Sequence, residues 1–338
     1  MLGQAHGFEK PCGGLLAPDA QQMLGRFGLT LPAHLLVDPQ IFAVRTIDLQ
    51  SELARYYQRF YLNCDRAAFD RWLISLMPDH IEYRPESRVE RIKALPKGGY
   101  LLQINQEESS RELRARFVVG ADGSFSFVRR QLMPAAQIMR YVAIQEIYED
   151  VHEQPFYSVL FDKRITPCYC WALSKNGRFI LGGAFPHDDV RARFERLKEA
   201  ARKVDFHFGE VLERQSCLVS YPTHRRELCL GDGAGAFLAG EAAGFISPSS
   251  LEGLSYAFDS AQLLAQAFNG ALSCTVATRE GDSPLLADSP EELAACYRRL
   301  CRPLRRKLRK KTAKAAALYN PALRRLIMKS GLSALSPL

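Results

Sequence analysis

Residues 237–265, FLAGEAAGFISPSSLEGLSYAFDSAQLLA, constrain the fold of this chain more than any other segment. A short buried strand over 236–239 runs into Gly240-Glu241-Ala242-Ala243-Gly244, and a Pro-x-x-x-Glu-Gly sequence then leads into a long helix with one apolar face. A helix that begins near Gly253 and Leu254 offers free backbone N–H groups and the positive end of a dipole. This end suits a pyrophosphate or the electron-rich edge of a reduced flavin ring, and the alternative is a loop ahead of a core helix.

A second string, FVVGADGSFSFVRR over 117–130, repeats this order on a smaller scale. A buried strand over 117–119 runs directly into Gly120-Ala121-Asp122-Gly123. Small residues let the backbone approach a ligand closely, and the Asp122 carboxylate can accept a hydrogen bond from a ribose or ribityl hydroxyl. The alternative interpretation of the same letters is an ordinary β-turn.

A third string, KPCGGLLAPDA over 10–20, places a cysteine beside two glycines. Cys12, Gly13 and Gly14 form a loop that can lie flat against a planar ligand. Cys12 is either redox-active or structural, and nothing in the sequence indicates a lowered thiol pKa.

The fourth string is CYCWALSK over 168–175. Because side chains alternate along a strand, Tyr169 and Trp171 share one face. They either line an apolar pocket or pack in the core.

Local patterns predict the remaining elements. A hairpin is expected from ESRVERIKAL and YLLQIN around a Lys97-Gly98-Gly99 turn, and the basic C-terminal segment is expected to be helical. Three strands, 156–162, 168–174 and 178–185, favour an antiparallel sheet outside the main one. Further helices are predicted over 19–29, 65–77 and 188–203.

Composition excludes several protein classes. Of the 338 residues, 47% are apolar and 24% charged, which excludes a disordered, collagen-like or coiled-coil chain. The 9 cysteines include no C-x-x-C pair, so neither a disulfide scaffold nor a metal site is expected, and free thiols without a secretion signal favour the cytoplasm.

The four strings, together with NCDRAAFDRWL, resemble the geranylgeranyl reductase-like group of FAD-dependent oxidoreductases, in the wider p-hydroxybenzoate hydroxylase-type fold, and in particular the bacterial CbrA proteins. The resemblance implies an α/β fold. An FAD-binding Rossmann-like domain would be formed by 1–140 and 225–272, an antiparallel substrate domain by 141–224, and a helical basic region by 273–338.

The resemblance also implies roles for individual residues. The Cys12 loop would lie by the isoalloxazine, and Arg66 would face the phosphates. The two glycine strings would contact the ribityl chain and phosphates, and two aromatic residues would line the substrate cavity. The implied FAD-binding residues are Cys12, Gly13, Gly14, Arg66, Gly120, Asp122, Gly123, Gly240, Glu241, Ala242, Ala243, Gly244, Gly253 and Leu254; the implied substrate-binding residues are Tyr169 and Trp171. No catalytic residue is identified.

Three departures from the family pattern stand out. Glu241 replaces the Asp of many relatives, and Leu251 replaces the first glycine of a Gly-Glu-Gly sequence. The strand, G-x-G-x-x-G turn and helix with which relatives begin are missing before Lys10, so we expect an incomplete dinucleotide-binding domain and a native protein that is longer.

The implied function is FAD-dependent oxidation–reduction of an apolar or lipid substrate, such as reduction of isoprenoid C=C bonds. The alternatives are an FAD-dependent monooxygenase and a non-catalytic remnant, and the sequence does not identify the electron donor. From Leu293 onward the chain has 13 Lys or Arg and no Asp or Glu, while the net charge is +8, so the preceding part carries −5. Residues 293–338 favour an anionic membrane surface as partner over nucleic acid, because base-stacking platforms and recognised motifs are missing. A cytoplasmic protein that attaches peripherally to the inner membrane face is one expectation, and a solvated helix packed on the core is the alternative.

Overall fold

The computed structural model describes residues 12–106, 109–152, 155–275, 289–331 and 334–335. Contacts divide the chain into two compact units. Within the described ranges, unit 1 comprises residues 77–139 and 220–310, and unit 2 comprises 12–76, 140–219 and 311–335. Among these residues, no helix has both the length and the apolar content that crossing a bilayer requires.

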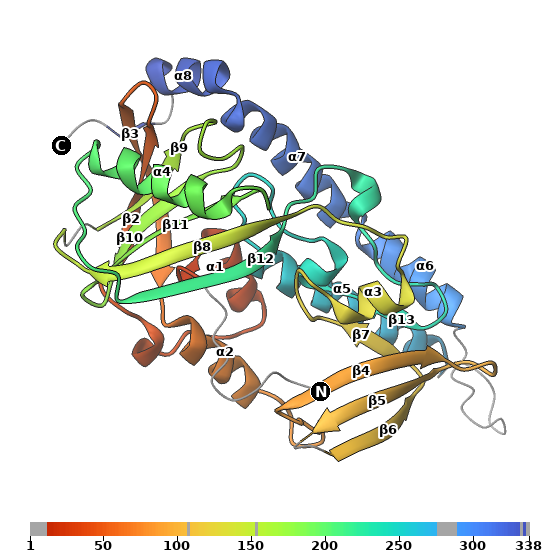
Figure 1. The fold of residues 1–338 in the computed structure, drawn as a ribbon. Coiled ribbons are helices and arrows are strands. Elements are labelled where there is room, and N and C mark those ends of the chain that lie inside the picture. Colours follow the sequence, from red (N-terminus) through yellow and green to blue (C-terminus); the bar gives the residue numbers. More distant parts are fainter. Residues whose placement is uncertain (1–11, 107–108, 153–154, 276–288, 332–333, 336–338) are drawn as a thin grey trace. The chain divides into compact units, whose positions relative to one another are not determined.

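Unit 1 is built around two short parallel strands, β7 (Val118–Gly120) and β13 (Ala236–Leu238). Val118 pairs with Ala236 and Gly120 with Leu238, so both strands end at the same edge. Each strand precedes a helix, α3 (Phe127–Leu132) or α5 (Leu254–Thr275). The two predicted buried strands and the predicted long helix are therefore confirmed (Figure 1).

The predicted hairpin of unit 1 is also confirmed and gains a third strand. The antiparallel sheet consists of β4 (Ser87–Ala94), β5 (Tyr100–Gln106) and β6 (Ser109–Ala115). Tyr100, which is 1% exposed, donates its hydroxyl hydrogen bond to Asp232 Oδ2 over 2.6 Å. This bond fastens the sheet to the loop that leads into β13.

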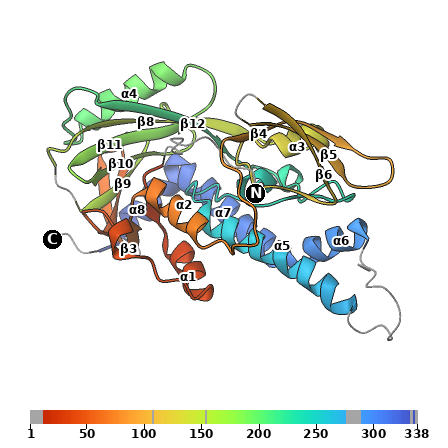
Figure 2. The same cartoon turned by 90° about the horizontal axis from the view of Figure 1, so that it is seen from below.

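Helix α6 (Pro290–Leu300) packs beside α5 and closes the core of unit 1 (Figure 2). Its N-terminus is fixed by a capping box between Ser289 and Glu292. Tyr297 is fully buried, and its hydroxyl donates to the carbonyl of Leu238 over 3.0 Å. The helix therefore supports β13 directly.

Unit 2 contains an eight-stranded sheet with the order β1-β3-β2-β9-β10-β11-β8-β12. Most neighbours are antiparallel, as predicted, but β2 and β9 run parallel. A parallel pair needs a long crossover, and here the chain between the two strands passes through unit 1. The strands are β1 (Leu15–Leu16), β2 (Ile41–Asp48), β3 (Leu53–Asn63), β8 (Arg140–Glu149), β9 (Phe156–Phe161), β10 (Cys170–Lys175), β11 (Arg178–Phe185) and β12 (Glu213–Ser220).

The helices predicted in this part of the chain are present. Helix α4 packs against β11 and buries Phe194 and Leu197 in an aromatic-rich core. The predicted helical tail consists of α6 and two further helices, α7 (Arg302–Tyr319) and α8 (Pro321–Ser330). The others are α1 (Pro18–Arg26), α2 (Arg66–Ser75) and α4 (Val190–Arg202), with short 3₁₀ segments η1 (Ala33–Leu35), η2 (Arg225–Glu227) and η3 (Gly240–Ala243).

The compact units do not follow the predicted division of the chain. Residues 12–76 pack with the large sheet because β2 pairs with β9. The predicted boundaries describe cofactor and substrate roles, which packing does not test, so they stay a prediction. The predicted loop over 274–290 lies mostly outside the described residues.

Candidate functional site

The two glycine-containing strings of unit 1 meet at the carboxyl edge of the β7–β13 pair. The backbone N–H of Ala239 donates to the carbonyl of Gly120 over 3.0 Å, so the segments that follow the two strands start side by side. Ligands of open α/β sheets bind at this kind of edge. The sequence separates Gly120 and Gly240 by more than a hundred residues, and the parallel pairing brings them together.

Arg129 holds these two segments in place, and the sequence analysis did not single it out. The residue is 2% exposed, and its guanidinium donates to the carbonyls of Ala242 (3.1 Å), Ala136 (2.7 Å) and Glu227 (2.5 Å). A buried arginine needs such acceptors because an unsatisfied buried charge is costly. Arg129, which belongs to the string 117–130, therefore fixes the loop of the string 237–265. In the sequence, its position in FVRR was the only feature that could have indicated this role.

The Asp122 carboxylate has a structural task. Its Oδ2 accepts hydrogen bonds from the N–H groups of Phe127 (2.6 Å) and Val128 (3.1 Å), which begin α3. Ser126 Oγ accepts a further hydrogen bond from the N–H of Arg129 over 3.0 Å. One carboxylate oxygen of Asp122 thus caps a helix, and only Oδ1 is left for the predicted contact with a ribityl hydroxyl.

Glu241 also binds the backbone of its own unit. Its Oε1 accepts from the N–H of Ser220 over 2.7 Å. The extra methylene relative to Asp allows this reach. The Ser220 hydroxyl is buried and has no hydrogen-bond partner within the described ranges, so a polar atom beside Glu241 is available to a bound group.

The glycines of unit 1 fall into two classes. A Cβ on Gly120 would lie 2.7 Å from Leu238, and Gly123, Gly240 and Gly244 have φ values of 74°, 56° and 87°, so the fold itself requires these glycines. Gly253 differs, because among the described residues its Cβ would meet only Ile246, at 3.8 Å. Its own unit gives no packing or backbone reason for a glycine at the start of α5.

Leu251, which stands before α5 where relatives have a glycine, has a backbone conformation that glycine favours. Leu251 has a φ of 50°, in the left-handed region. Its N–H donates to the Ser247 carbonyl over 2.8 Å, and the N–H of Ser247 donates to the Glu252 carbonyl over 3.1 Å. The chain at Leu251 therefore keeps the backbone conformation of the glycine in Gly-Glu-Gly, although leucine adds a side chain there.

In unit 2, the predicted loop at Cys12 is held by a lysine that the sequence analysis overlooked. Lys175, the last residue of β10, donates from Nζ to the carbonyls of Cys64 (2.6 Å) and Gly13 (3.3 Å). Burial lowers the pKa of this lysine. A Cβ on Gly14, whose φ is 71°, would collide with Lys175 and with the Cys64 carbonyl. A Cβ on Gly13 would touch only Leu173 within the described part of the chain, at 3.5 Å.

Arg66 and Cys12 are neighbours in this unit. Arg66 Nη1 lies 3.9 Å from Cys12 Sγ, and Arg66 Nε pairs with Asp70 Oδ1 at 2.9 Å, one turn along α2. Although burial opposes it, the nearby Cys12 and Asp70 raise the pKa of Arg66, which stays charged. Burial raises the pKa of the neighbouring Cys64 thiol to about 11, so Cys64 is a structural cysteine.

Tyr169 and Trp171 lie together in unit 2, with ring centroids 5.9 Å apart and planes at 60°. Trp171 covers Gly182 of β11, where a Cβ would lie 2.5 Å from the indole ring. Its Nε1 is buried and has no hydrogen-bond partner among the residues that the structure describes. The predicted pair is thus assembled, while its role toward a substrate stays a prediction.

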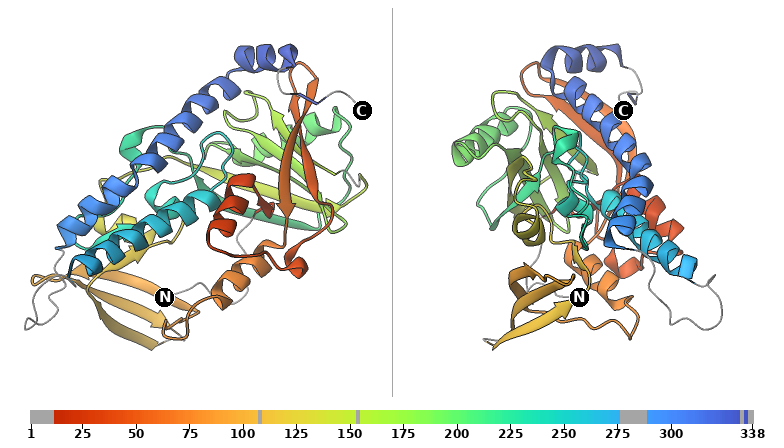
Figure 3. Two further views of the ribbon diagram at one scale, coloured as in Figure 1. Left: turned by 180° about the vertical axis from the view of Figure 1, so that it is seen from behind. Right: turned by 90° about the vertical axis from the view of Figure 1, so that its right-hand side faces the viewer.

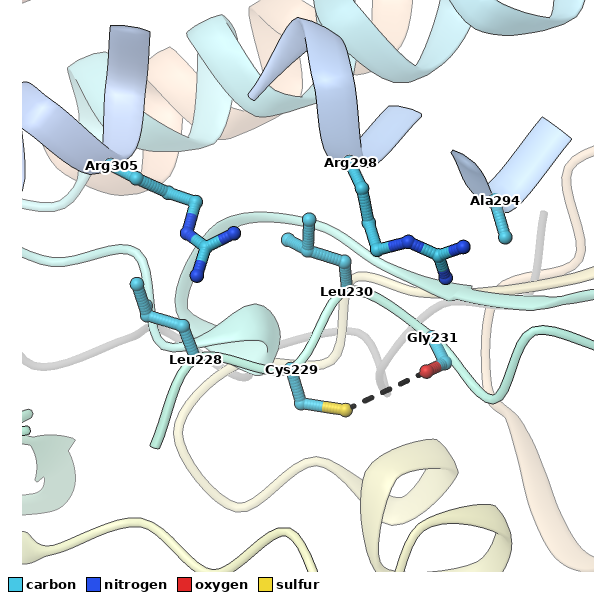
Figure 4. A pocket seen from close by; sticks show the side chains of 7 residues that line it. All are labelled: Leu228, Cys229, Leu230, Gly231, Ala294, Arg298 and Arg305. Atoms are coloured by element: carbon cyan, nitrogen blue, oxygen red, sulfur yellow. Dashed lines mark hydrogen bonds between the residues drawn. The ribbon is translucent and has the colours of Figure 1, made fainter. Parts of the chain in front are cut away.

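A cavity of about 260 Å³ lies elsewhere in unit 1 (Figure 4). The guanidinium groups of Arg298 and Arg305 and the side chains of Leu228 and Leu230 line it. None of the predicted cofactor or substrate residues contributes to this cavity.

A curated relative indicates the family of this chain, and solved structures indicate its fold. A scan against protein-family models finds no match. The chain is 44% identical to the Escherichia coli K12 protein CbrA over 327 residues, which cover 97% of this chain and 87% of that protein. A geranylgeranyl bacteriochlorophyll reductase-like protein from Thermoplasma acidophilum aligns with a TM-score of 0.77 at 17% identity, over 97% of this chain and 83% of that one. PqsL of Pseudomonas aeruginosa, a probable FAD-dependent monooxygenase, aligns with a TM-score of 0.66 at 18% identity, over 98% and 92%.

Proposed function

Since the chain belongs to the CbrA family, we propose that it is an FAD-dependent oxidoreductase that acts on an apolar organic substrate. The observation that carries this proposal is the meeting of the two glycine strings at the carboxyl edge of β7 and β13. That arrangement matches the place where nucleotide cofactors bind in α/β sheets. The fold shared with the Thermoplasma protein and PqsL supports it.

The residues present fit FAD chemically. In unit 1, the start of α5 supplies backbone N–H groups beside Gly253, where the missing side chain leaves room for a ligand. The Ser220 hydroxyl, which has no hydrogen-bond partner among the described residues, and Asp122 Oδ1 suit the hydroxyls of a ribityl chain. In unit 2, the charged Arg66 suits a phosphate, and Gly13 leaves one face of its loop free of a side chain.

When bound, FAD would supply hydride and electron transfer, and the chain would supply binding and orientation. We assign the apolar substrate to the Tyr169–Trp171 pair, whose rings offer an apolar surface and one indole N–H that has no acceptor within the described ranges. An isoprenoid C=C bond is our first candidate substrate, because the Thermoplasma neighbour is named as geranylgeranyl bacteriochlorophyll reductase-like. Hydroxylation with O₂ is the second candidate, favoured by the fold of PqsL. Incorporation of oxygen from ¹⁸O₂ into the product would decide for hydroxylation.

The cofactor is tested by titrating the purified chain with FAD and recording its visible absorbance. Gly253→Ala is the informative variant, because its Cβ makes only ordinary contacts and should not disturb the fold. We expect the affinity for FAD to fall about tenfold or more, which corresponds to roughly 1.4 kcal/mol, with the melting temperature unchanged.

Gly270→Ala is the matched control on the same helix. No described residue lies within 4 Å of its Cβ position, and Gly270 is remote from the first turn of α5. This variant should bind FAD as the unchanged chain does. Equal affinity of the Gly253→Ala variant would contradict the assigned cofactor contact, and a folded chain that binds no FAD at all would favour a non-catalytic protein.

A further inference from the structure

Helix α8 has well-defined ends that its own sequence provides. The Asn320 side chain accepts hydrogen bonds from the N–H groups of Ala322 (3.0 Å) and Leu323 (3.2 Å), and Pro321 occupies the first turn. Gly331 ends the helix with a φ of 64°. The ten residues between these caps therefore form a rigid element with two distinct faces.

The inner face of α8 is anchored to the large sheet of unit 2. Arg324 and Asp48 are 2% and 0% exposed and pair over 2.8 Å. The side chain of Met328 is buried, and its carbonyl accepts from Arg55 Nε over 3.0 Å. These contacts at the end of the β2–β3 hairpin fix the rotation of α8 about its own axis (Figure 3).

The outer face of α8 is apolar and uncovered within the described part of the chain. Leu323, Leu326 and Ile327, at i, i+3 and i+4, are 46%, 66% and 43% exposed. Leu335, just after the helix, is 40% exposed and is held in place by a backbone bond to Tyr56. Clustered exposed apolar side chains mark an interaction surface more often than scattered ones do.

The charges on α7 and α8 select the partner. Lys329 on α8 and Lys314 on α7 are exposed, and no acidic residue follows Glu292 in the sequence. An exposed apolar helix face in a segment that carries cations and no acidic residue is typical of a segment that lies in the interface of an anionic bilayer.

We propose that α8 inserts Leu323, Leu326 and Ile327 into the surface of an anionic lipid bilayer. Within the basic tail, only this face of α8 would enter the membrane. The proposal does not depend on the proposed redox chemistry. The buried Arg324–Asp48 pair would hold the helix rigid while its apolar face enters the lipid.

The test is sedimentation of the full chain with vesicles made of equal parts phosphatidylglycerol and phosphatidylcholine. Leu326→Ser combined with Ile327→Ser should reduce the partition coefficient about tenfold or more, because together the two side chains expose roughly one whole aliphatic residue. Lys314→Gln with Lys329→Gln should weaken binding several-fold at low salt and reduce its salt dependence.

Phe42→Ser is the matched control, since Phe42 on β2 is 61% exposed and lies in the same unit. It should bind vesicles as the unchanged chain does, and circular dichroism should show that all variants are folded. Absence of vesicle binding at low salt, or undiminished binding by the Leu326/Ile327 variant, would overturn the proposal. So would a concentration-dependent dimer in light scattering that only this variant abolishes, because a second copy would then be the partner of α8.

Discussion

The ion pair between Asp48 and Arg324 gives a prediction whose size follows from the structure. Asp48 Oδ2 accepts two bonds from Arg324, at 2.8 Å and 3.0 Å, while its Oδ1 accepts from the N–H groups of Gln50 and Ser51. In the Asp48→Asn variant, the remaining carbonyl oxygen can keep the two backbone bonds. The amide nitrogen would then face the donors of Arg324, whose charge stays buried without a counter-ion at this contact.

Removal of one partner from a buried pair costs about 3–5 kcal/mol of unfolding free energy. For a unit of this size, about 1 kcal/mol shifts the melting temperature by roughly 2–4 °C. We therefore expect a decrease of roughly 6–20 °C for the Asp48→Asn variant. Replacing both residues by apolar ones, Asp48→Leu with Arg324→Met, should restore most of the stability, because the desolvation penalty disappears with both charges.

Urea unfolding followed by circular dichroism measures this difference. Asp162→Asn is the control, because Asp162 is 2% exposed but its partner Arg164 is 72% exposed, so the loss should stay near 1 kcal/mol or below. Burial opposes ionisation of Asp48, yet the bonds and charge of Arg324 lower its pKa below 3.8. The pair therefore stabilises the unit above this pH, and its contribution is lost as the pH falls further. A loss below about 1 kcal/mol for Asp48→Asn would refute the reasoning.

Three further changes test other parts of the molecule. Leu251→Gly should raise the unfolding free energy by about 1 kcal/mol in a urea titration, because it relieves a left-handed φ of 50°; a lower stability would show that the side chain contributes more than the strain costs. Gly182→Ala should lower the stability by about 1–3 kcal/mol and change the near-ultraviolet dichroism of Trp171, which must move aside; an unchanged spectrum would contradict the close approach. Lys175→Met should leave the Gly13 carbonyl without its donor and lower the unfolding free energy by about 1–3 kcal/mol. Cys12 in the loosened loop should then be alkylated faster, as followed by peptide mass spectrometry, and an unchanged rate would argue that Lys175 does not hold the loop.

The sequence predicted those elements whose signals are local. Strands β7 and β13 are short apolar runs that stop at a glycine, and helix α2 begins at the Asp65 cap and ends before Pro78. Strands β2 and β3 were missed, although LARYYQRFYLN carries many aromatic residues typical of strands. Strand β3 pairs with β2 in a local hairpin, but β9, on the other side of β2, lies about a hundred residues further along the chain, and no local pattern specifies that pairing.

The same limit applies to the candidate site. The sequence drew attention to Cys12 and Arg66, but the residue that holds their loop, Lys175, comes from a strand more than a hundred residues away. Asp122 was predicted to accept a hydrogen bond from a ribityl hydroxyl. In the structure, one of its two carboxylate oxygens accepts instead from backbone N–H groups at the N-terminus of α3. A short motif specifies which residue types are present, whereas their partners depend on tertiary contacts.

The glycines show how much of a ligand-binding motif describes the ligand. Glycine-rich strings arise either because the backbone needs a positive φ or close packing, or because a bound group must approach. Gly14 and Gly120 belong to the first class, since a Cβ at either position would collide with the protein's own atoms. At Gly13 and Gly253 a Cβ would make only ordinary van der Waals contacts with the described residues. The described structure therefore gives no reason for glycine there, whereas the approach of a ligand would. A loss of FAD affinity in Gly13→Ala or in Gly253→Ala, without a loss of stability, would therefore be direct evidence that the cofactor approaches the glycine that was replaced.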